Sequence, residues 1–365
     1  MRLSTLFTAS GLAGLAAAGL VPRAFQIPKG NGFPNPNNAQ ERQIALQAGG
    51  KLPGAPLPTK LGPRSTTAFQ LIAFNELFET AFFSSLLHNI TTKTKGYEIP
   101  GKEREEAEKV IRTVLAQEQQ HAIGALATLQ SAKQFVPKPC KYVFPVNTLK
   151  DAIALAETFT AVVLGVLQDA NVIFATEAQP EITRLISSVI GQEGEQNGLY
   201  RLYLNQIPSE SPFLTTVPAA FAWSALQLFV VPNSCPQDLK NIALPIFPAL
   251  SVNGGPIANI KPKDQTLTFK ANLKGFRPSK GYLGKTQGLY ITYMTGQQLP
   301  ISVKPDKIHW EDGVVTIEAK FPYNEYIMQG FSHAAITTAD KFKNPDAVVV
   351  KTLAAPGIIQ VSNPL

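Results

Sequence analysis

The 365-residue sequence contains few charged residues and only two cysteines, two tryptophans and four histidines. Charged residues make up 16% of it, against about 25% in a typical soluble domain. Hydrophobic residues make up 44%. This composition excludes an intrinsically disordered chain, which has low hydrophobicity, and a long coiled coil, which is rich in charge. The chain is longer than one typical domain of about 100–200 residues, so two domains are expected.

A concentrated basic segment is also lacking, although the net charge is +7. Residues 1–64 carry seven basic residues and one acidic residue, residues 65–245 carry 13 and 17, and residues 246–365 carry 13 and eight. The basic excess is therefore spread over both ends of the chain. Nucleic-acid binding requires a basic patch on one face, so we expect no nucleic-acid partner.

Several catalytic motifs are missing too. The sequence has no G-x-S-x-G, which marks the nucleophile of the α/β-hydrolases. It also has neither the phosphate-binding loop of nucleotide hydrolases nor the glycine fingerprint of dinucleotide-binding domains. Acyl transfer and nucleotide-dependent chemistry of these kinds are therefore not expected.

Residues 1–20 have the pattern of a signal peptide for secretion. Arg2 supplies a positive charge, residues 3–15 are mostly apolar, and the alanines at 16–18 are the small residues that precede a cleavage site. No later run of 18 or more apolar residues occurs. We expect a secreted protein of the extracellular space or cell wall, with no membrane partner after cleavage of this segment.

The cysteines and a glycosylation motif agree with secretion. Cys140 and Cys235 both lie in proline-rich segments, and an even number of cysteines in a secreted chain favours a disulfide. A loop of this length gives a constraint of about 4–5 kcal/mol in the chain-entropy model. A bonded pair also leaves no thiolate for catalysis. Asn89 begins the sequence Asn-Ile-Thr, a site for an N-linked glycan.

The periodicity of the sequence predicts an α+β protein with several parts. Residues 21–65, rich in Pro, Gly and Asn, are expected to form an extended arm. Residues 66–245 are expected to form an antiparallel four-helix bundle with a short fifth helix. The predicted helices cover residues 67–89, 102–132, 148–175, 180–206 and 218–231.

Residues 246–365 have the alternation of β-strands. The segments TLTFKANLK, GLYITYMTG, VVTIEAKF and AVVVKTLAA each alternate apolar and polar residues between turn-forming residues. Asp312-Gly313, between two such segments, is a strong hairpin signal. Short strands at this spacing predict a small β-sandwich as the second domain.

Acidic residues occupy the middle of apolar helix faces in all four long predicted helices. Glu76, with Glu79 one turn later, lies on the first; Glu118, Glu157 and Glu193 lie on the others. Burying an unpaired carboxylate costs several kcal/mol, so such a set requires compensation. A shared pair of metal cations supplies it, whereas a hydrogen-bonded network with raised pKa values is the metal-free alternative.

The second and fourth helices carry related motifs. Glu118 and His121 are three residues apart, a spacing that puts both side chains on one helix face. Di-iron and di-manganese bundles take a Glu from two helices and a Glu-x-x-His from the other two. After Glu193, however, Gln196 stands at the histidine position, and an amide is a poor metal ligand. Glu195 lies on a different stripe of its helix.

The sequence resembles the ferritin-like domain family, and within it the secreted fungal late sexual development proteins. The resemblance rests on AFNELFETAFF, EQQHAIGAL, VVLGVLQDA, VIGQEGEQNGLYR and IPSESPFLTTVPAAFAWSALQLFVVPNSCP, and it covers roughly residues 66–240. It implies a four-helix bundle with metal ligands in its core. Our first hypothesis is that this core binds one or two ions of iron or manganese and, if it is redox-active, handles oxygen or peroxide. The ligands that the resemblance implies are Glu76 or Glu79, Glu118, His121, Glu157 and Glu193.

A second function is compatible with the same residues. The bundle is then a metal-free scaffold with a vestigial site, and the β domain binds partners outside the cell. Aromatic residues of that domain could stack on cell-wall glycans, although such residues more often fill a core. They are Tyr290, Tyr293, Trp310, Tyr323 and Tyr326. The sequence leaves the oligomeric state open.

Overall fold

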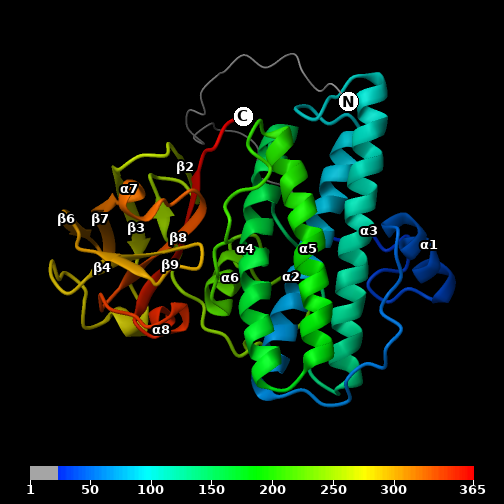
Figure 1. Ribbon diagram of the computed structural model, residues 1–365, viewed down its shortest axis with the longest axis horizontal. Coiled ribbons are helices and arrows are strands. Elements are labelled where there is room, and N and C mark those ends of the chain that lie inside the picture. Colours follow the sequence, from blue (N-terminus) through cyan, green and yellow to red (C-terminus); the bar gives the residue numbers. More distant parts are fainter. Residues whose placement is uncertain (1–23) are drawn as a thin grey trace.

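A computed structural model describes residues 24–365, so the predicted signal peptide at residues 1–20 lies outside the described residues. Within the described range the protein is α+β, with a helical part followed by two β-sheets (Figure 1). The long helices are α2 (Pro63–Thr91), α3 (Gly101–Ser131), α4 (Leu149–Thr176) and α5 (Pro180–Tyr203). Their ends lie within four residues of the predicted ends.

The four long helices lie side by side (Figure 1). Short connections join α2 to α3 and α4 to α5, so each of these pairs runs antiparallel. Helix α2 is central, because 20 of its 29 residues are buried. Phenylalanines of α2 and α4 form the core between them: the ring centroids of Phe78 and Phe159 are 5.4 Å apart, and those of Phe82 and Phe159 are 4.9 Å apart.

Helix α4 is the most apolar of the long helices. Among the described residues it is the helix that is long and apolar enough to cross a membrane by length and composition. In the structure, 61% of its most apolar window is buried inside the protein, against α2, α5 and the short helix α6 (Ala219–Leu226). Such burial is typical of a core helix.

The arm contains a helix that the sequence analysis did not predict. Helix α1 (Asn38–Ala48) packs against α3 at the outer side of the helical part (Figure 1). Asn37 and Gln40 form a capping box, each side chain accepting a hydrogen bond from the other's backbone N–H. This capping pair is the feature of the sequence that indicates the helix. An apolar repeat of helical period is lacking in α1, because the helix buries only the two adjacent residues Ile44 and Ala45.

Two sheets follow the helices. One contains, in spatial order, β1 (Ser251–Val252), β3 (Gln265–Asn272), β7 (Val314–Phe321) and β6 (Lys307–Glu311). The other contains β2 (Ile257–Ile260), β9 (Thr352–Val361), β8 (Gly330–Thr337), β4 (Tyr290–Thr295) and β5 (Ile301–Val303). Strands β2 and β9 are parallel, and the other pairs are antiparallel. Inward side chains of both sheets share one hydrophobic core, in which Tyr293 packs between Phe269 and Phe321.

The five-stranded sheet is buried on both faces. Every residue of β8 and β9 is buried. One face contributes to the core between the sheets, and the other packs on α6, where the ring of His333 lies 5.8 Å from that of Phe221 (centroid to centroid). The helices and the sheets therefore share an apolar interface, and Figure 1 shows α6 between them.

Two local predictions for the β region have different outcomes. The Asp312-Gly313 hairpin is confirmed: it joins β6 to β7, and both residues have positive φ, 44° and 81°. The prediction of one strand over AVVVKTLAA is wrong. Its first half forms helix α8 (Pro345–Val349), because Asn344 caps the helix and Pro345 occupies the first turn. Strand β9 begins only at Thr352.

The predicted disulfide between Cys140 and Cys235 is confirmed. It ties the long connection between α3 and α4 to the segment after α6. Asn89 lies half-buried in the last turns of α2, where its Oδ1 accepts a hydrogen bond from Thr94. Its glycosylation stays a prediction.

Gly165 allows α4 to approach the segment that leads into α6. A Cβ at this position would meet the backbone oxygen of Thr215 and would lie 2.6 Å from Cγ2 of Val217. We therefore expect Gly165→Ala to destabilise the protein by about 1–3 kcal/mol through overpacking. Gly191→Ala in α5, where a Cβ has no neighbour within 4 Å among residues 24–365, should instead stabilise it by up to about 1 kcal/mol. Urea unfolding of both variants tests this, and equal stabilities would contradict it.

Candidate metal centre

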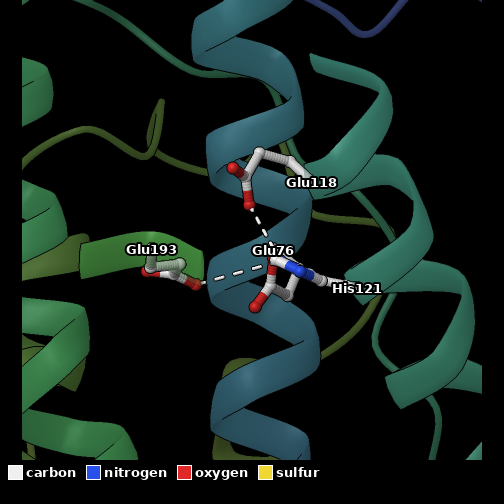
Figure 2. A group of neighbouring side chains, drawn as sticks. All are labelled: Glu76, Glu118, His121 and Glu193. Carbon is white, nitrogen blue, oxygen red and sulfur yellow. Dashed lines mark hydrogen bonds and ion pairs between the residues drawn. The ribbon is translucent and has the colours of Figure 1, made fainter. Parts of the chain in front are cut away.

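Four side chains from three helices meet in the helical part. Glu76 of α2, Glu118 and His121 of α3 and Glu193 of α5 each place one ligand atom within 4.8 Å of the others. Figure 2 shows these side chains pointing toward one another. Nδ1 of His121 lies 3.1 Å from Oε2 of Glu118, 3.6 Å from Oε2 of Glu76 and 3.9 Å from Oε1 of Glu193. We call these four residues the Glu/His cluster.

The local sequence explains how the cluster forms. Glu118 and His121 are one turn apart on α3, so both side chains leave the helix on the same side, toward α2. The three carboxylate side chains are 1% exposed, and that of His121 is 15% exposed. Glu195 is exposed on the other side of α5, as expected from its position. The Glu/His cluster is thus a group of polar side chains buried in the apolar interior of the helical part.

Burial dominates the titration of the cluster. It raises the pKa of Glu76 to about 7, although the neighbouring His121 opposes this shift. Burial also raises the pKa of Glu193 well above its usual value, and the negative charges of Glu118 and Glu76 raise it further. For His121, burial lowers the pKa, but the neighbouring carboxylates of Glu118 and Glu76 outweigh it and leave a pKa well above 6.5. Metal-free, the cluster therefore holds protons at neutral pH.

Three carboxylate oxygen atoms of the cluster make no hydrogen bond to the described residues. Among the residues that the structure describes, Oε2 of Glu76 and both carboxylate oxygens of Glu193 are buried without a hydrogen-bond partner. A buried acceptor left unpaired costs about 1–3 kcal/mol, and more when it is charged. A cation among these oxygens removes that cost. The residues present therefore fit a metal ion.

Glu79 lies beside the Glu/His cluster without being one of its four members. It is buried, and its Oε2 accepts a hydrogen bond of 3.1 Å from Asn75. Burial raises its pKa well above the usual value, and the charge of Glu193 is the next cause. Tyr200 of α5 is a further neighbour, since cluster carboxylates contribute to the raised pKa of its buried hydroxyl.

Gln196, at the position of the missing second histidine, donates hydrogen bonds. Its Nε2 lies 2.8 Å from Oε1 of Glu118 and 3.1 Å from Oε1 of Gln117. Its Oε1 accepts a hydrogen bond from Tyr200. The amide therefore orients Glu118 and satisfies one of its oxygens. This role differs from the metal-ligand position at which the sequence analysis placed Gln196.

Glu157 is not part of the Glu/His cluster, which corrects its assignment as a ligand. Its Oε1 pairs with Nη1 of Arg201 at 2.8 Å, and its Oε2 accepts a hydrogen bond of 2.9 Å from Gln360 of β9. Burial raises the pKa of Glu157 to about 7, and the charge of Glu210 adds to this, although Arg201 opposes both. The partner that sequence analysis missed is Arg201, a lone arginine on the buried stripe of α5 that carries Glu193.

A cavity of about 370 Å³ reaches the Glu/His cluster from the surface. Residues of α2, α3, α4 and α5 form its walls together with residues 48–53 of the arm, and Glu76 and His121 belong to its lining. The cluster is therefore accessible to a small molecule without unfolding of the helices.

The aromatic residues predicted for glycan binding differ in exposure. Tyr293 is fully buried between the sheets, and its hydroxyl donates to the backbone oxygen of Lys320. Of the two roles considered for Tyr293, glycan stacking and core packing, its burial supports core packing. Trp310 is half-buried, and its Nε1 donates to the backbone oxygen of Lys285. Glycan binding by the remaining residues stays a prediction.

Comparison with known protein families and with curated proteins finds no match to this chain. The site must therefore be judged by its own chemistry. Three carboxylates and one imidazole form a donor set suited to divalent or trivalent transition metals. The set distinguishes poorly among manganese, iron and zinc. The Glu/His cluster could thus hold a metal ion, and its arrangement alone leaves the identity of that metal open.

Proposed function

We propose that the protein is a secreted ferritin-like protein that binds iron or manganese in the Glu/His cluster. The observation that carries the proposal is the set of buried oxygens of Glu76 and Glu193 that make no hydrogen bond to the described residues, within reach of Glu118 and His121. Two antiparallel helix pairs, joined by a long connection between α3 and α4, are the arrangement expected of ferritin-like bundles. The sheets would then form the β-sandwich domain.

Each cluster residue would have a defined part in holding the ion. Glu76, Glu118 and Glu193 would neutralise the charge of the cation, and His121 would complete the donor set from α3. Gln196 would hold Glu118 in place through its hydrogen bond. A bound iron or manganese ion would supply electron transfer to or from dioxygen or peroxide. A role in fungal development, in the extracellular space or cell wall, is proposed from the sequence resemblance alone.

One observation favours a different function. His121 pairs with Glu118, and Gln196 donates to the other oxygen of Glu118, so part of the cluster is satisfied without a metal. The alternative is an extracellular or cell-wall binding protein whose helical part is a scaffold with a vestigial site. The intramolecular disulfide is consistent with an extracellular location in both proposals.

Titration with Mn²⁺ and with Fe²⁺ under anaerobic conditions separates the two functions. We expect wild-type protein to bind near-stoichiometric metal, and Glu193→Gln to weaken binding at least 10–100-fold, the scale that even outer-sphere substitutions reach. Glu195→Gln, an exposed neighbour on the same helix, should bind like wild type. Admitting oxygen or peroxide to the iron-loaded protein then tests redox activity. A folded wild-type protein that binds no metal supports the scaffold alternative.

A further inference from the structure

The cavity beside the Glu/His cluster is lined mostly by apolar groups. Its volume of about 370 Å³ lies at the lower end of the about 300–1,000 Å³ typical of small-molecule sites. The larger apolar side chains of the lining come from the arm and from α2, α4 and α5, and they include Leu52, Phe69, Ile72, Leu167, Ile186 and Val189. A cavity of this kind binds an apolar body better than it binds an ion.

Gln120, a polar residue of this lining, is buried without a hydrogen-bond partner among the described residues. Gln120 of α3 is 8% exposed, and within residues 24–365 neither its amide nitrogen nor its amide oxygen has a hydrogen-bond partner. Oε1 of Gln192, on the facing helix α5, is likewise buried and unpaired among those residues. An amide offers both a donor and an acceptor. Gln120 can therefore satisfy one hydroxyl of a molecule in the cavity, which would in turn satisfy Gln120.

The lining of the cavity selects an uncharged ligand. The lining contains both an acidic residue, Glu76, and a basic residue, Lys51, so the charges at the cavity favour neither an anionic nor a cationic ligand. The apolar walls would not compensate the lost hydration of an organic anion or of an organic cation. A neutral molecule with an apolar body and one hydroxyl meets both conditions.

We propose that this cavity binds a small, uncharged organic molecule that places its apolar body against the cavity walls and its hydroxyl on the amide of Gln120. Bound there, the molecule lies beside Glu76 and His121. The inference rests on the proposed function only where it makes this molecule a substrate of the metal centre. Binding itself depends on the cavity and on Gln120.

A matched pair of probes tests the inference on the full secreted protein. 2-Naphthol and 2-methylnaphthalene have the same ring system, and only the first has a hydroxyl. A net hydrogen bond of about 1 kcal/mol corresponds to about a fivefold difference in affinity. We expect fluorescence titration to show wild-type protein binding 2-naphthol about fivefold tighter than 2-methylnaphthalene. Gln120→Leu should abolish that preference while it retains binding of 2-methylnaphthalene.

A second pair of variants places the probes in the cavity. Gly124 belongs to the lining, and of the residues that the structure describes a Cβ there would meet only Leu52, at 3.5 Å. The larger side chain of Gly124→Leu should fill the cavity and weaken binding of both probes at least tenfold. Gly191→Leu is the control, because Gly191 is an exposed helical glycine outside the lining. Circular dichroism and thermal unfolding verify that both variants fold.

The outcomes separate this inference from the proposed function. Metal-loaded wild-type protein that binds neither probe would overturn the inference while the metal site stands. Protein that binds both probes with the expected preference but takes up no metal would support the cavity and contradict the proposed function. Equal probe binding by folded Gly124→Leu and Gly191→Leu would place the probes elsewhere and overturn the inference. A hydroxyl preference that survives Gln120→Leu would overturn the role of Gln120.

Discussion

Replacement of Arg201 by methionine is expected to lower the free energy of unfolding by about 3–5 kcal/mol, because it leaves a buried carboxylate without its counter-charge. Arg201 and Glu157 are almost fully buried and pair at 2.8 Å. Nε of Arg201 also donates to the backbone oxygen of Ile207. Gln360 of β9 donates to the second oxygen of Glu157, so the pair joins the helices to the sheet.

Two further variants make this result specific. Arg184→Met on the same helix breaks only the exposed pair with Glu181, whose side chains are 79% and 70% exposed, and should change stability little. The double variant Arg201→Met/Glu157→Leu removes both buried charges and should recover most of the loss. Because burial raises the pKa of Glu157 to about 7, the cost of Arg201→Met should shrink below that pH. Equal costs for Arg201→Met and Arg184→Met would contradict the account.

The metal-free protein should lose stability as the pH rises from 6 to 8, and bound metal should oppose that loss. Burial raises the pKa of Glu76 and Glu157 to about 7, and it does the same for Asp169 of α4, which accepts a hydrogen bond from Thr216. The unfolded chain titrates near the usual values. The folded state therefore holds more protons than the unfolded state, and stability falls with pH by about 1 kcal/mol per such group across this interval. The raised pKa of His121 acts in the same direction.

The titration of His333 changes the stability of the protein in the opposite direction, mostly below pH 6. Burial lowers its pKa to about 4, so the stability lost through His333 appears as the pH falls below about 6.5.

A divalent ion requires deprotonated ligands and releases their protons on binding. Manganese should therefore raise the thermal midpoint more at pH 8 than at pH 6. Scanning calorimetry of chelator-treated and Mn²⁺-loaded protein measures this. In the metal-free Glu76→Gln variant, the thermal midpoint should depend less on pH, because one group with a raised pKa is removed. Metal-free protein that gains stability between pH 6 and 8 would contradict the account.

The long helices were predictable because each is governed by its own sequence. Helix α4, for example, combines a continuous apolar run with Thr148 as its N-cap, whose side chain accepts from the N–H of Asp151. The pairing of Glu118 with His121 was predictable for the same reason, since a spacing of three fixes both residues on one helix face. The local sequence Asp312-Gly313 likewise predicted the hairpin between β6 and β7.

The remaining features depend on partners far away in the chain. Glu157 has the same apolar helical surroundings as Glu193, and its role is decided by Arg201 and by Gln360, which is 203 residues later. The cavity requires residues of the arm to lie against α3, and no period in the arm indicates this contact. Helix α8 shows the converse case, in which a cap at Asn344 overrides the β-propensity of a valine-rich segment.

Metal content is the measurement that tests the central claim most directly. Protein isolated from its native host should be analysed by elemental mass spectrometry, beside a Glu118→Ala/His121→Ala variant and the Glu195→Gln control. Circular dichroism must show that all three are folded. The account predicts near-stoichiometric iron or manganese in wild type and in Glu195→Gln, and its loss from the double variant. Folded wild-type protein without metal, or with metal that survives in the double variant, would contradict it.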